Sequence, residues 1–491
     1  MNTATELEEM GSKIYKVKSE DRDHTIRLDT NDFIKVPQPL PPAPGLIPNP
    51  TENIINVDEL ESISEIPEQL RNNELMTMSN PPKNKWRVYA LGLWLFSIGM
   101  ADATPGAVLP YIEEYYNLTY TLVSLIWMTF AAGFVSFACL AHKIQPLLGR
   151  EKSFTVGSAC SVLMYAIVSS GTKFPVICVG FFFGGAGYAV VISQMNVFLT
   201  NFQNSSKYLS VTQSLYGVGA TISPLIATSF VSAGIKWNLY YVILVGLMAI
   251  TSVVLYISFK GADTDLAPWD FDENDLENEK SETPTELLLL SLKSKITWLL
   301  AFFVFFYQGS EVALGGWIVT YLLNYRHGTH NVGYVASGFW AGLTLGRLCV
   351  ARPMHNMFGL RRSVIICSVI STIAVVLTWV VPNIIAAGVF VSISGVFIGP
   401  NYPLMVAYSA LKGLIPRKIL IITLTVVTAF GFSGGAIFPF LVGVISQKAG
   451  TYVVLPMFIA LYLSMLILWL LVPNQERILK QSTLTFWQKV W

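Results

Sequence analysis

The chain has 491 residues, of which 53% are hydrophobic and 13% charged, and its formal net charge is +1. Together with a mean hydropathy of +0.53, this composition excludes an ordinary soluble domain and predicts a protein that crosses a membrane many times. The near-zero net charge gives no sign of a nucleic-acid partner.

The first 85 residues are polar and contain no cleavable signal peptide. They mix charges, Ser and Asn with a proline-rich run at residues 36–50 and an acidic patch at residues 58–68. This composition cannot bury enough apolar surface to order itself. We therefore predict a disordered cytoplasmic tail over residues 1–85, with a regulatory tail as the alternative.

From Trp86 onward, apolar runs repeat, each with the ~20 residues needed to span a bilayer. They predict twelve helices, at residues 88–111, 119–141, 153–171, 174–198, 209–233, 238–259, 296–323, 331–351, 362–381, 384–410, 419–446 and 451–472. The longest break follows the sixth helix and is acidic. The predicted fold is an all-α membrane protein with two six-helix pseudo-repeats. Its parts are six-helix bundles at 86–259 and 296–473, an acidic cytoplasmic linker at 260–295 and a cytoplasmic C-terminal tail at 474–491.

Lys and Arg gather in the short loops on one side of these helices, which predicts that side, with both termini, to be cytoplasmic. The loop after the first helix, on the opposite side, is acidic, with Glu113 and Glu114. No address signal distinguishes the plasma membrane from the vacuolar membrane. We expect a monomer.

Two carboxylates lie near the middle of predicted helices, Asp102 in the first and Glu311 in the seventh. A charged side chain at the bilayer centre costs about 2.5–3.5 kcal/mol on insertion scales, so an acid kept there indicates a function. Burial favours the uncharged form of a carboxyl group. We therefore predict proton coupling by Asp102, Glu311 or both, and the alternative is a buried acid that only bonds a neighbouring helix.

Helical periodicity gives the seventh helix two different faces. The face expected to line a cavity contains Glu311 together with Tyr307, Gln308, Gly315 and Ile318. The opposite face, expected to pack closely on other helices, contains Gly309, Ala313, Gly316 and Thr320.

Corresponding helices of the two halves carry similar Gly and Pro patterns. Gly219 and Pro224 have the same spacing in the fifth helix as Gly434 and Pro439 in the eleventh. Repetition in the same order indicates a duplicated six-helix unit. The predicted packing or hinge residues are Pro105, Gly219, Pro224, Gly316, Gly434 and Pro439.

Over residues 86–473 the chain resembles a major facilitator superfamily transporter. The loop sequence LAHKIQPLLGREK keeps Gly149 and Arg150 of the superfamily's motif but lacks its Asp, and a second copy, GLTLGRLCVARPMHNMFGLRR, contains Arg347. The sequences GSEVALGGWIVTY and GAGYAVVISQMN resemble the fucose-permease-like branch, including uncharacterised fungal members. In the second of these, Val191 and Ile192 stand where the branch often has a polar or acidic residue.

Neutral polar side chains within the apolar runs are candidate substrate ligands, and the alternative for each is an ordinary interhelical hydrogen bond. They are Gln194, Asn196, Gln213, Tyr216, Gln308, Trp317, Asn401 and Tyr402. Trp317 is also compatible with an anchor at the membrane interface. The resemblance implies a gating role for the basic residues Arg150, Arg347 and Arg361, and for Arg347 a lipid-bound side chain is the alternative.

The sequence thus favours a secondary active transporter that alternates its access around a midplane site and takes up a small polar solute with protons. An exporter of organic compounds and a non-transporting sensor or structural membrane protein are the alternatives. No enzymatic motif, cofactor loop or metal site is apparent, and the five cysteines form no CxxC pair.

Overall fold

The computed structural model describes residues 17–19, 22–24, 76–203, 205–266, 284–410 and 414–474. The chain divides into two units, Met1–Glu68 and Gln69–Trp491. In the first unit, β1 (Val17–Ser19) and β2 (Arg22–His24) pair antiparallel. The remainder of the predicted tail up to residue 75, residues 267–283 of the predicted linker and the C-terminal tail from residue 475 lie outside the described residues.

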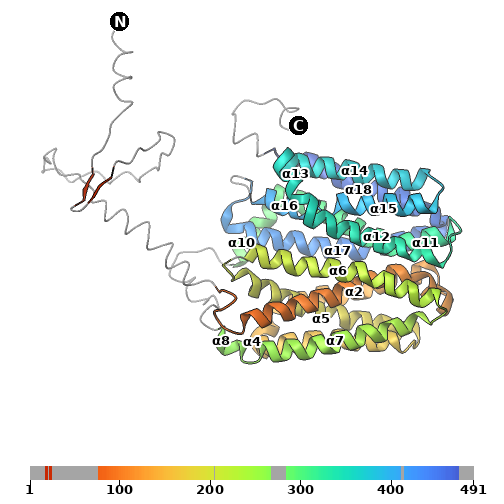
Figure 1. Cartoon of the computed structure of the whole chain (residues 1–491), viewed down its shortest axis with the longest axis horizontal. Coiled ribbons are helices and arrows are strands. Elements are labelled where there is room, and N and C mark those ends of the chain that lie inside the picture. Colours follow the sequence, from red (N-terminus) through yellow and green to blue (C-terminus); the bar gives the residue numbers. More distant parts are fainter. Residues whose placement is uncertain are drawn as a thin grey trace, which may run out of the picture. The chain divides into compact units, whose positions relative to one another are not determined.

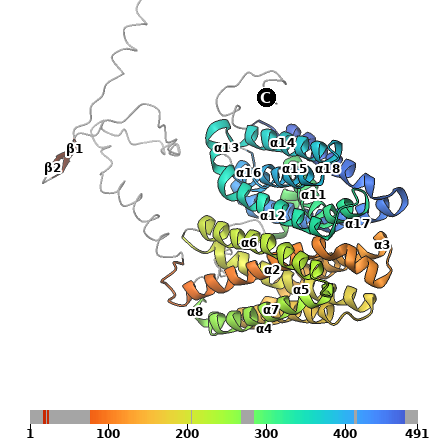
Figure 2. The same ribbon diagram turned by 45° about the vertical axis from the view of Figure 1, so that its right-hand side comes forward.

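The second unit is a bundle of long helices in two groups (Figures 1 and 2). The N-terminal group contains α2 (Asn84–Tyr116), α3 (Tyr120–Val123), α4 (Leu125–Ser169), α5 (Phe174–Thr200), α6 (Ser205–Ser232) and α7 (Trp237–Phe259). The C-terminal group contains α11 (Lys295–Asn324), η3 (His330–Gly333), α12 (Tyr334–Leu345), the π-helix η4 (Gly346–Val350), α13 (Ala351–Phe358), α14 (Leu360–Val380), α15 (Ile384–Ile398), α16 (Asn401–Ser409), α17 (Arg417–Ala449), η5 (Thr451–Val453) and α18 (Val454–Leu471).

The fold confirms the predicted all-α membrane architecture. Within the described residues, ten helical spans are long and apolar enough to cross a membrane. Two further crossings are made by α2, which has 33 residues, and by the interrupted stretch α12–η4–α13. These add up to the twelve crossings that the sequence predicted.

The two groups repeat the same packing pattern. In the N-terminal group α2 packs on α6 and α7, and α4 packs on α5 and α7. In the C-terminal group α11 packs on α17 and α18, and α14 packs on α15 and α18. The groups meet where α6 packs on α12, α4 on α17, and α2 on α11. The first two contacts are the same contact with the two halves exchanged, and the third joins the first helices of the two halves. This arrangement is that of a duplicated six-helix unit.

The predicted second and third helices, residues 119–141 and 153–171, correspond to two separate membrane spans, Tyr120–Ala138 and Leu147–Ser169. Both belong to α4, which bends at Gly149, a residue with φ 72° and ψ 172°. Gly359, at the equivalent point between α13 and α14, has φ 79° and ψ 169°. Glycine adopts positive φ without strain from a Cβ atom. The same backbone turn therefore occurs at the same place in both halves.

The predicted tenth helix, residues 384–410, is interrupted between α15 and α16. The break falls at Gly399 and Pro400, and Pro400 has no N–H to continue the backbone ladder. An apolar run alone does not reveal such a break, because the composition stays apolar on both sides.

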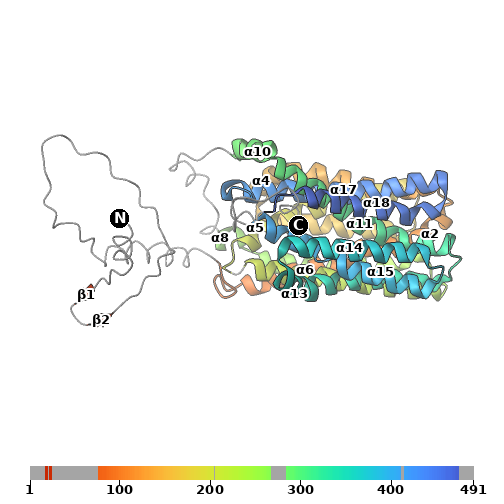
Figure 3. The same ribbon diagram turned by 90° about the horizontal axis from the view of Figure 1, so that it is seen from above.

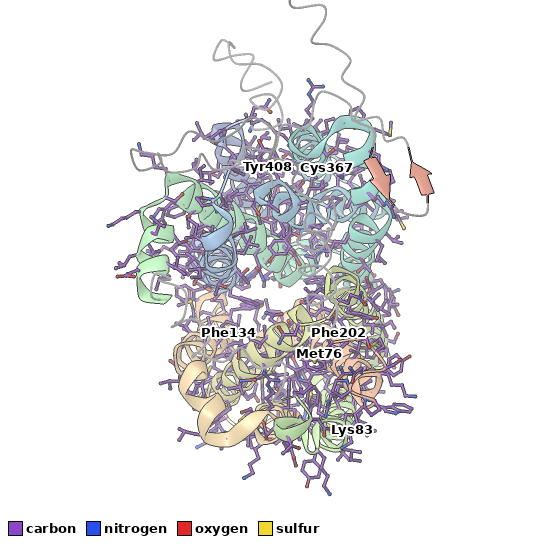
Figure 4. All side chains as sticks on the ribbon, turned by 90° about the vertical axis from the view of Figure 1, so that its left-hand side faces the viewer. Met76, Lys83, Phe134, Phe202, Cys367 and Tyr408 are labelled. Carbon is purple, nitrogen blue, oxygen red and sulfur yellow. The ribbon has the colours of Figure 1, made fainter. Side chains whose placement is uncertain are left out.

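Parts of the predicted tail and linker belong to the packed unit. Met76 is buried beside Phe202 (Figure 4), and its N–H donates to the Asn201 carbonyl at 2.9 Å. The linker contains α8 (Ala262–Asp265) and α10 (Pro284–Lys293). Helix α10 lies along the edge of the bundle (Figure 3) and bonds to α17 through Ser291 and Thr423, 2.9 Å apart.

Helices α8 and α10 mark one end of the bundle, at the left of Figure 1, which we call the linker end. The opposite end, where α2 and α11 finish, we call the far end. Glu113, which the sequence placed in a loop, lies in the last turns of α2 at the far end.

Several helix crossings depend on glycine, and two of them are equivalent in the two halves. A Cβ atom on Gly219 of α6 would lie 2.1 Å from the Phe96 carbonyl oxygen of α2, and one on Gly434 of α17 would lie 2.1 Å from that of Phe305 in α11. These are equivalent helix pairs of the two halves, and each depends on close backbone contact.

We expect Gly219→Val to lower the free energy of unfolding of the purified protein by roughly 1–3 kcal/mol, the usual cost of overpacking. The control is Gly246→Val in α7, because a Cβ atom there meets nothing within 4 Å. Unfolding followed in detergent should separate the two variants. Equal stability of both variants would contradict the importance of the α2–α6 crossing.

Candidate functional site

Asp102 faces an internal space in the middle of α2. Its side chain is exposed, although its neighbours on the same helical face, including Ile98, Pro105 and Gly106, are buried. A side chain exposed within a buried face borders a cavity rather than the outer surface. Asp102 Oδ2 accepts a hydrogen bond of 3.2 Å from the hydroxyl of Tyr216 on α6.

Two further tyrosines lie within electrostatic range of the same carboxylate. Tyr165 of α4 and Tyr188 of α5 have their hydroxyls 2.7 Å apart, and both interact electrostatically with Asp102. Asp102 therefore bonds one phenol group and lies near two others, and the three come from three helices. Phenol hydroxyls donate and accept hydrogen bonds, so this wall of the cavity suits a polar ligand.

Glu311 of α11 forms an ion pair with Arg347. Arg347 Nη2 lies 2.9 Å from Glu311 Oε2 and 3.1 Å from Oε1. The same nitrogen donates to the hydroxyl of Tyr307 at 2.9 Å. The Glu311 side chain is 7% exposed and that of Arg347 23% exposed, so the pair is shielded from bulk solvent.

Arg347 lies in the π-helix η4, between α12 and α13. A Cβ atom on the preceding Gly346 would lie 2.1 Å from the Val396 carbonyl oxygen of α15, so the backbones touch there. Single π-turns inside α-helices occur often at functional sites, because the extra residue changes the direction of the side chains. Here the π-turn carries the arginine that binds Glu311.

Tyr216 connects the two parts of the site. Besides its hydrogen bond to Asp102, it interacts electrostatically with Glu311 and Arg347. Tyr216 therefore bonds the carboxylate of the N-terminal group and lies within electrostatic range of the ion pair of the C-terminal group. We call Asp102, Tyr216, Tyr307, Glu311 and Arg347 the central cluster.

The central cluster offers both hydrogen-bond acceptors and donors. Asp102 presents a carboxylate, whereas Arg347 forms its hydrogen bonds to described residues through Nη2. Its Nε is buried without a hydrogen-bond partner in the described part of the chain. A guanidinium has five N–H donors, so Arg347 keeps donors for a ligand.

Of the other predicted ligands, the structure brings Tyr402 against a member of the cluster. Its ring stacks on Tyr307 with centroids 6.1 Å apart, and its hydroxyl lies 3.4 Å from Thr428 Oγ1. Gln308 is half-buried and points toward α17, where its Oε1 lies beside Gly431. Both come from the C-terminal group.

The remaining predicted ligands lie in different surroundings. Gln194 is buried in α5, whereas Asn196 and Gln213 are exposed. Asn401 is fully buried and donates to Ser368 Oγ at 3.1 Å, which ties α16 to α14. Trp317 is fully buried, donates to the Pro439 carbonyl at 2.9 Å and packs against the ring of Tyr120. A buried tryptophan is not an anchor at the membrane interface.

The other two predicted gating residues lie at the linker end. The Arg150 backbone N–H donates to Asp263 Oδ1 at 2.6 Å, where the chain turns at Gly149. The Arg361 guanidinium binds carbonyl groups near the end of α18, including that of Leu470 at 3.0 Å. These bonds fasten the turn at Gly149 to the linker helix α8, and the start of α14 to the end of α18.

The expected cavity face of α11 is shorter than predicted. Gly315 packs against Trp340 and against Gly106 of α2, and Ile318 is fully buried. The opposite face packs as expected, because Gly309 contacts Phe438 and Gly316 contacts Trp127. The open part of the helix therefore ends near Glu311.

Three prolines of the predicted hinge set lie inside continuous helices, Pro105 in α2, Pro224 in α6 and Pro439 in α17. Each leaves one backbone carbonyl of its helix without the usual N–H donor.

The sequence placed Tyr307 on the expected cavity face without naming it as a ligand, and it did not single out Tyr165 and Tyr188. For Tyr307 a signal existed, because it lies one helical turn before Glu311 on the same face. For Tyr165 and Tyr188 none did, since tyrosines are common in membrane helices. Among the described residues, no group of three or more His, Cys, Asp or Glu side chains is placed to hold a metal.

Hydrogen bonds between the described residues of the two groups gather at the far end. The Tyr120 N–H donates to Gln447 Oε1 at 2.9 Å, and Asn324 Nδ2 donates to the Tyr120 hydroxyl at 2.8 Å. On the other side, Ser229 Oγ lies 3.1 Å from the Tyr334 hydroxyl. Nearer the middle, Phe134 lies at the boundary of the groups (Figure 4), with its ring centroid 4.4 Å from that of Phe432. The structure is thus closed at the far end.

Comparison with known proteins gives the family. A family model described as Major Facilitator Superfamily matches residues 91–412. The chain is 25% identical over 397 residues to Bypass of stop codon protein 6 of Saccharomyces cerevisiae, covering 75% of this chain and 78% of that protein. It is 22% identical over 361 residues to the glucose/mannose transporter GlcP of Bacillus subtilis, covering 71% and 85%.

Solved structures share the fold. The nucleoside transporter NupG aligns with a TM-score of 0.60 at 10% identity, covering 82% of this chain and 100% of that one. FucP in its outward conformation aligns with a TM-score of 0.54 at 15% identity, covering 78% and 97%. At this level of identity, these likenesses show the fold alone.

Proposed function

Because the chain belongs to the Major Facilitator Superfamily and is therefore a multi-pass membrane transporter and no enzyme, we propose that it takes up a small polar solute together with protons. The central cluster carries this proposal. It brings an acceptor from one half and donors from the other half within electrostatic range of Tyr216. A ligand bound there contacts both halves, as alternating access around a midplane site requires.

Asp102 is the proposed proton site. It has a tyrosine hydroxyl as its hydrogen-bond partner and no ion-pair partner among the described residues, whereas Glu311 is paired with Arg347. An unpaired carboxylate in a membrane cavity gains more from a proton than a paired one does. In this scheme Glu311 holds Arg347 in place, and Asp102 loads and releases the proton.

The proposed solute is hydroxylated and uncharged, with sugars as the first class to test. Sugar hydroxyls donate to carboxylates such as Asp102 and accept from guanidinium groups such as Arg347. Two relatives support this choice: GlcP is named a glucose/mannose transporter, and a Brucella abortus protein 23% identical over 306 residues is named a glucose/galactose transporter. The resemblance to the fucose-permease-like branch agrees with the fold shared with FucP, which is named a fucose:proton symporter.

We further propose that the linker end faces the cytoplasm, as the Lys and Arg distribution indicates. The closed far end then faces away from the cytoplasm, and the structure is an inward-facing state. Three further points also remain predictions: the boundaries of the two bundles, the monomeric state, and the location in the plasma or the vacuolar membrane.

The test is transport in proteoliposomes that contain the purified protein, with a panel of labelled hexoses and, as a comparison class, nucleosides. Under an imposed inward proton gradient, we expect one of the hexoses to accumulate above equilibrium. Accumulation that needs the opposite gradient would favour an exporter. If no solute of a broad panel crosses under either gradient, the protein is better described as a sensor or structural member of the superfamily.

A further inference from the structure

A second polar pocket lies at the far end, away from the central cluster. It has a volume of about 630 Å³ and is lined by residues of both halves. Glu113, Glu114, Asn117 and Tyr120 come from the N-terminal group, and Asn324 and Gln447 come from α11 and α17. The lining contains two carboxylates and several neutral oxygen atoms, and it contains no Lys, Arg or His.

Glu113 is the unusual member of this lining. The residue is only 8% exposed, and its Oε1 is buried without a hydrogen-bond partner among the described residues. A buried carboxylate oxygen without a partner is destabilising unless the charge is neutralised. Glu114, the next residue, is exposed and adds a second negative charge at the mouth.

The pocket coincides with the contact that closes the far end. Tyr120 interacts electrostatically with Glu113 and bonds both Gln447 and Asn324 across the boundary between the halves. When the halves separate at this end, Asn324 and Gln447 move away and the pocket loses one wall. The Glu113 carboxylate then meets water.

We propose that this pocket, centred on Glu113, is a cation site that locks the far end closed. The ligand is a proton or an alkali-metal ion, because both neutralise a carboxylate among neutral oxygen ligands. A neutral solute would leave the charge unpaired. The closed state buries Glu113. The closed state therefore binds the cation more tightly than the open state does. By linkage, the cation favours closure, and its release favours opening.

The inference rests on the alternating access proposed above but not on the identity of the solute. Its test is the distance between spin labels at Lys236→Cys and Ile385→Cys, two exposed far-end positions in opposite halves. The labels are placed in a variant whose five native cysteines are replaced by alanine. Distances are measured by pulsed electron resonance in nanodiscs from pH 5 to pH 9, with NaCl, KCl or an organic salt of equal ionic strength.

We expect the short-distance, closed population to rise several-fold as pH falls, or as Na⁺ or K⁺ is added at pH 9. The first result identifies the proton and the second the metal ion. In Glu113→Gln, which is neutral at every pH, the closed population should stay high and lose this dependence. Ser229→Ala is the control, because it weakens far-end closure without touching the pocket. It should lower the closed population and keep the dependence on the cation.

The proposal is overturned if the wild-type distances respond to neither pH nor alkali ions, or if Glu113→Gln responds as the wild type does. Uptake measured with the same labelled protein separates a failure of the proposed cation site from a failure of the proposed transport function. Active uptake with cation-independent distances would contradict the gate site alone. A far end that never opens under any condition, with no uptake, would contradict the transport mechanism as well.

Discussion

Asp102→Asn is expected to abolish accumulation driven by a pH gradient while leaving passive exchange of the solute intact. The asparagine keeps the size of the side chain and an oxygen that accepts from the Tyr216 hydroxyl, a hydrogen bond of 3.2 Å in the structure. It removes the group that takes up the proton. With one proton per solute, a gradient of one pH unit supports about tenfold accumulation, since 1.4 kcal/mol corresponds to a factor of ten. In the variant, the solute concentration inside the vesicles should rise only to about that outside, a ratio of about one.

Two measurements give this experiment its controls. Glu286→Gln removes an exposed carboxylate from α10 at the linker end and should accumulate the solute as the wild type does. Counterflow of labelled against unlabelled solute should persist in Asp102→Asn, which shows that the site still binds. Full accumulation by Asp102→Asn would refute the role given to Asp102. Full accumulation by the double variant Asp102→Asn/Glu311→Gln would show that neither carboxylate couples transport to protons.

Breaking the Glu311–Arg347 pair from one side should be far more damaging than removing both partners. Glu311→Leu leaves the Arg347 charge in a site where its side chain is 23% exposed, and Arg347→Met leaves Glu311 at 7% exposed. Removing one partner of a buried ion pair costs about 3–5 kcal/mol, because the other charge stays buried without compensation. Each single variant should therefore unfold at a lower temperature and express poorly.

The double variant Glu311→Leu/Arg347→Met should recover most of the lost stability, since buried ion pairs are often replaced by apolar groups at little cost. It should nevertheless fail to transport, because the donors for the solute are gone. Arg352→Met, an exposed arginine of the neighbouring α13, should stay within about 0.5 kcal/mol of the wild type. Thermal unfolding in detergent measures all four variants. Additive losses in the double variant would contradict the pairing, because interacting residues are non-additive.

The central cluster shows the limit of sequence reasoning. The sequence predicted that Asp102 and Glu311 have a function, because an acid in an apolar run of bilayer length is costly. It also selected Arg347 and Tyr216 as polar residues within the membrane. It did not predict that Arg347 pairs with Glu311, since the two lie 36 residues apart on different helices. It also gave no reason to group Tyr216 with residues of the other half.

Other expectations changed because a polar residue's role depends on its neighbours. Trp317 and Asn401 were candidate ligands by type, yet they bond to Pro439 and Ser368 within the packed C-terminal group. Glu113 was expected in a loop, but α2 continues to Tyr116 and buries it. Periodicity marks which face of a helix is polar, but whether that face meets water, a cavity or another helix depends on packing.

The sequence by itself determined that this is a membrane protein with twelve crossings in two duplicated halves. It also determined that a carboxylate lies in the first helix of each half. Each follows from local information: the length of an apolar run, the cost of a charge within it, or a pattern repeated along the chain. The tertiary structure decided which of those groups meet. The ion pair, the tyrosine within electrostatic range of the acids of both halves and the buried Glu113 at the far end all join residues distant in sequence. Such contacts depend on how twelve helices pack, and no local pattern encodes that.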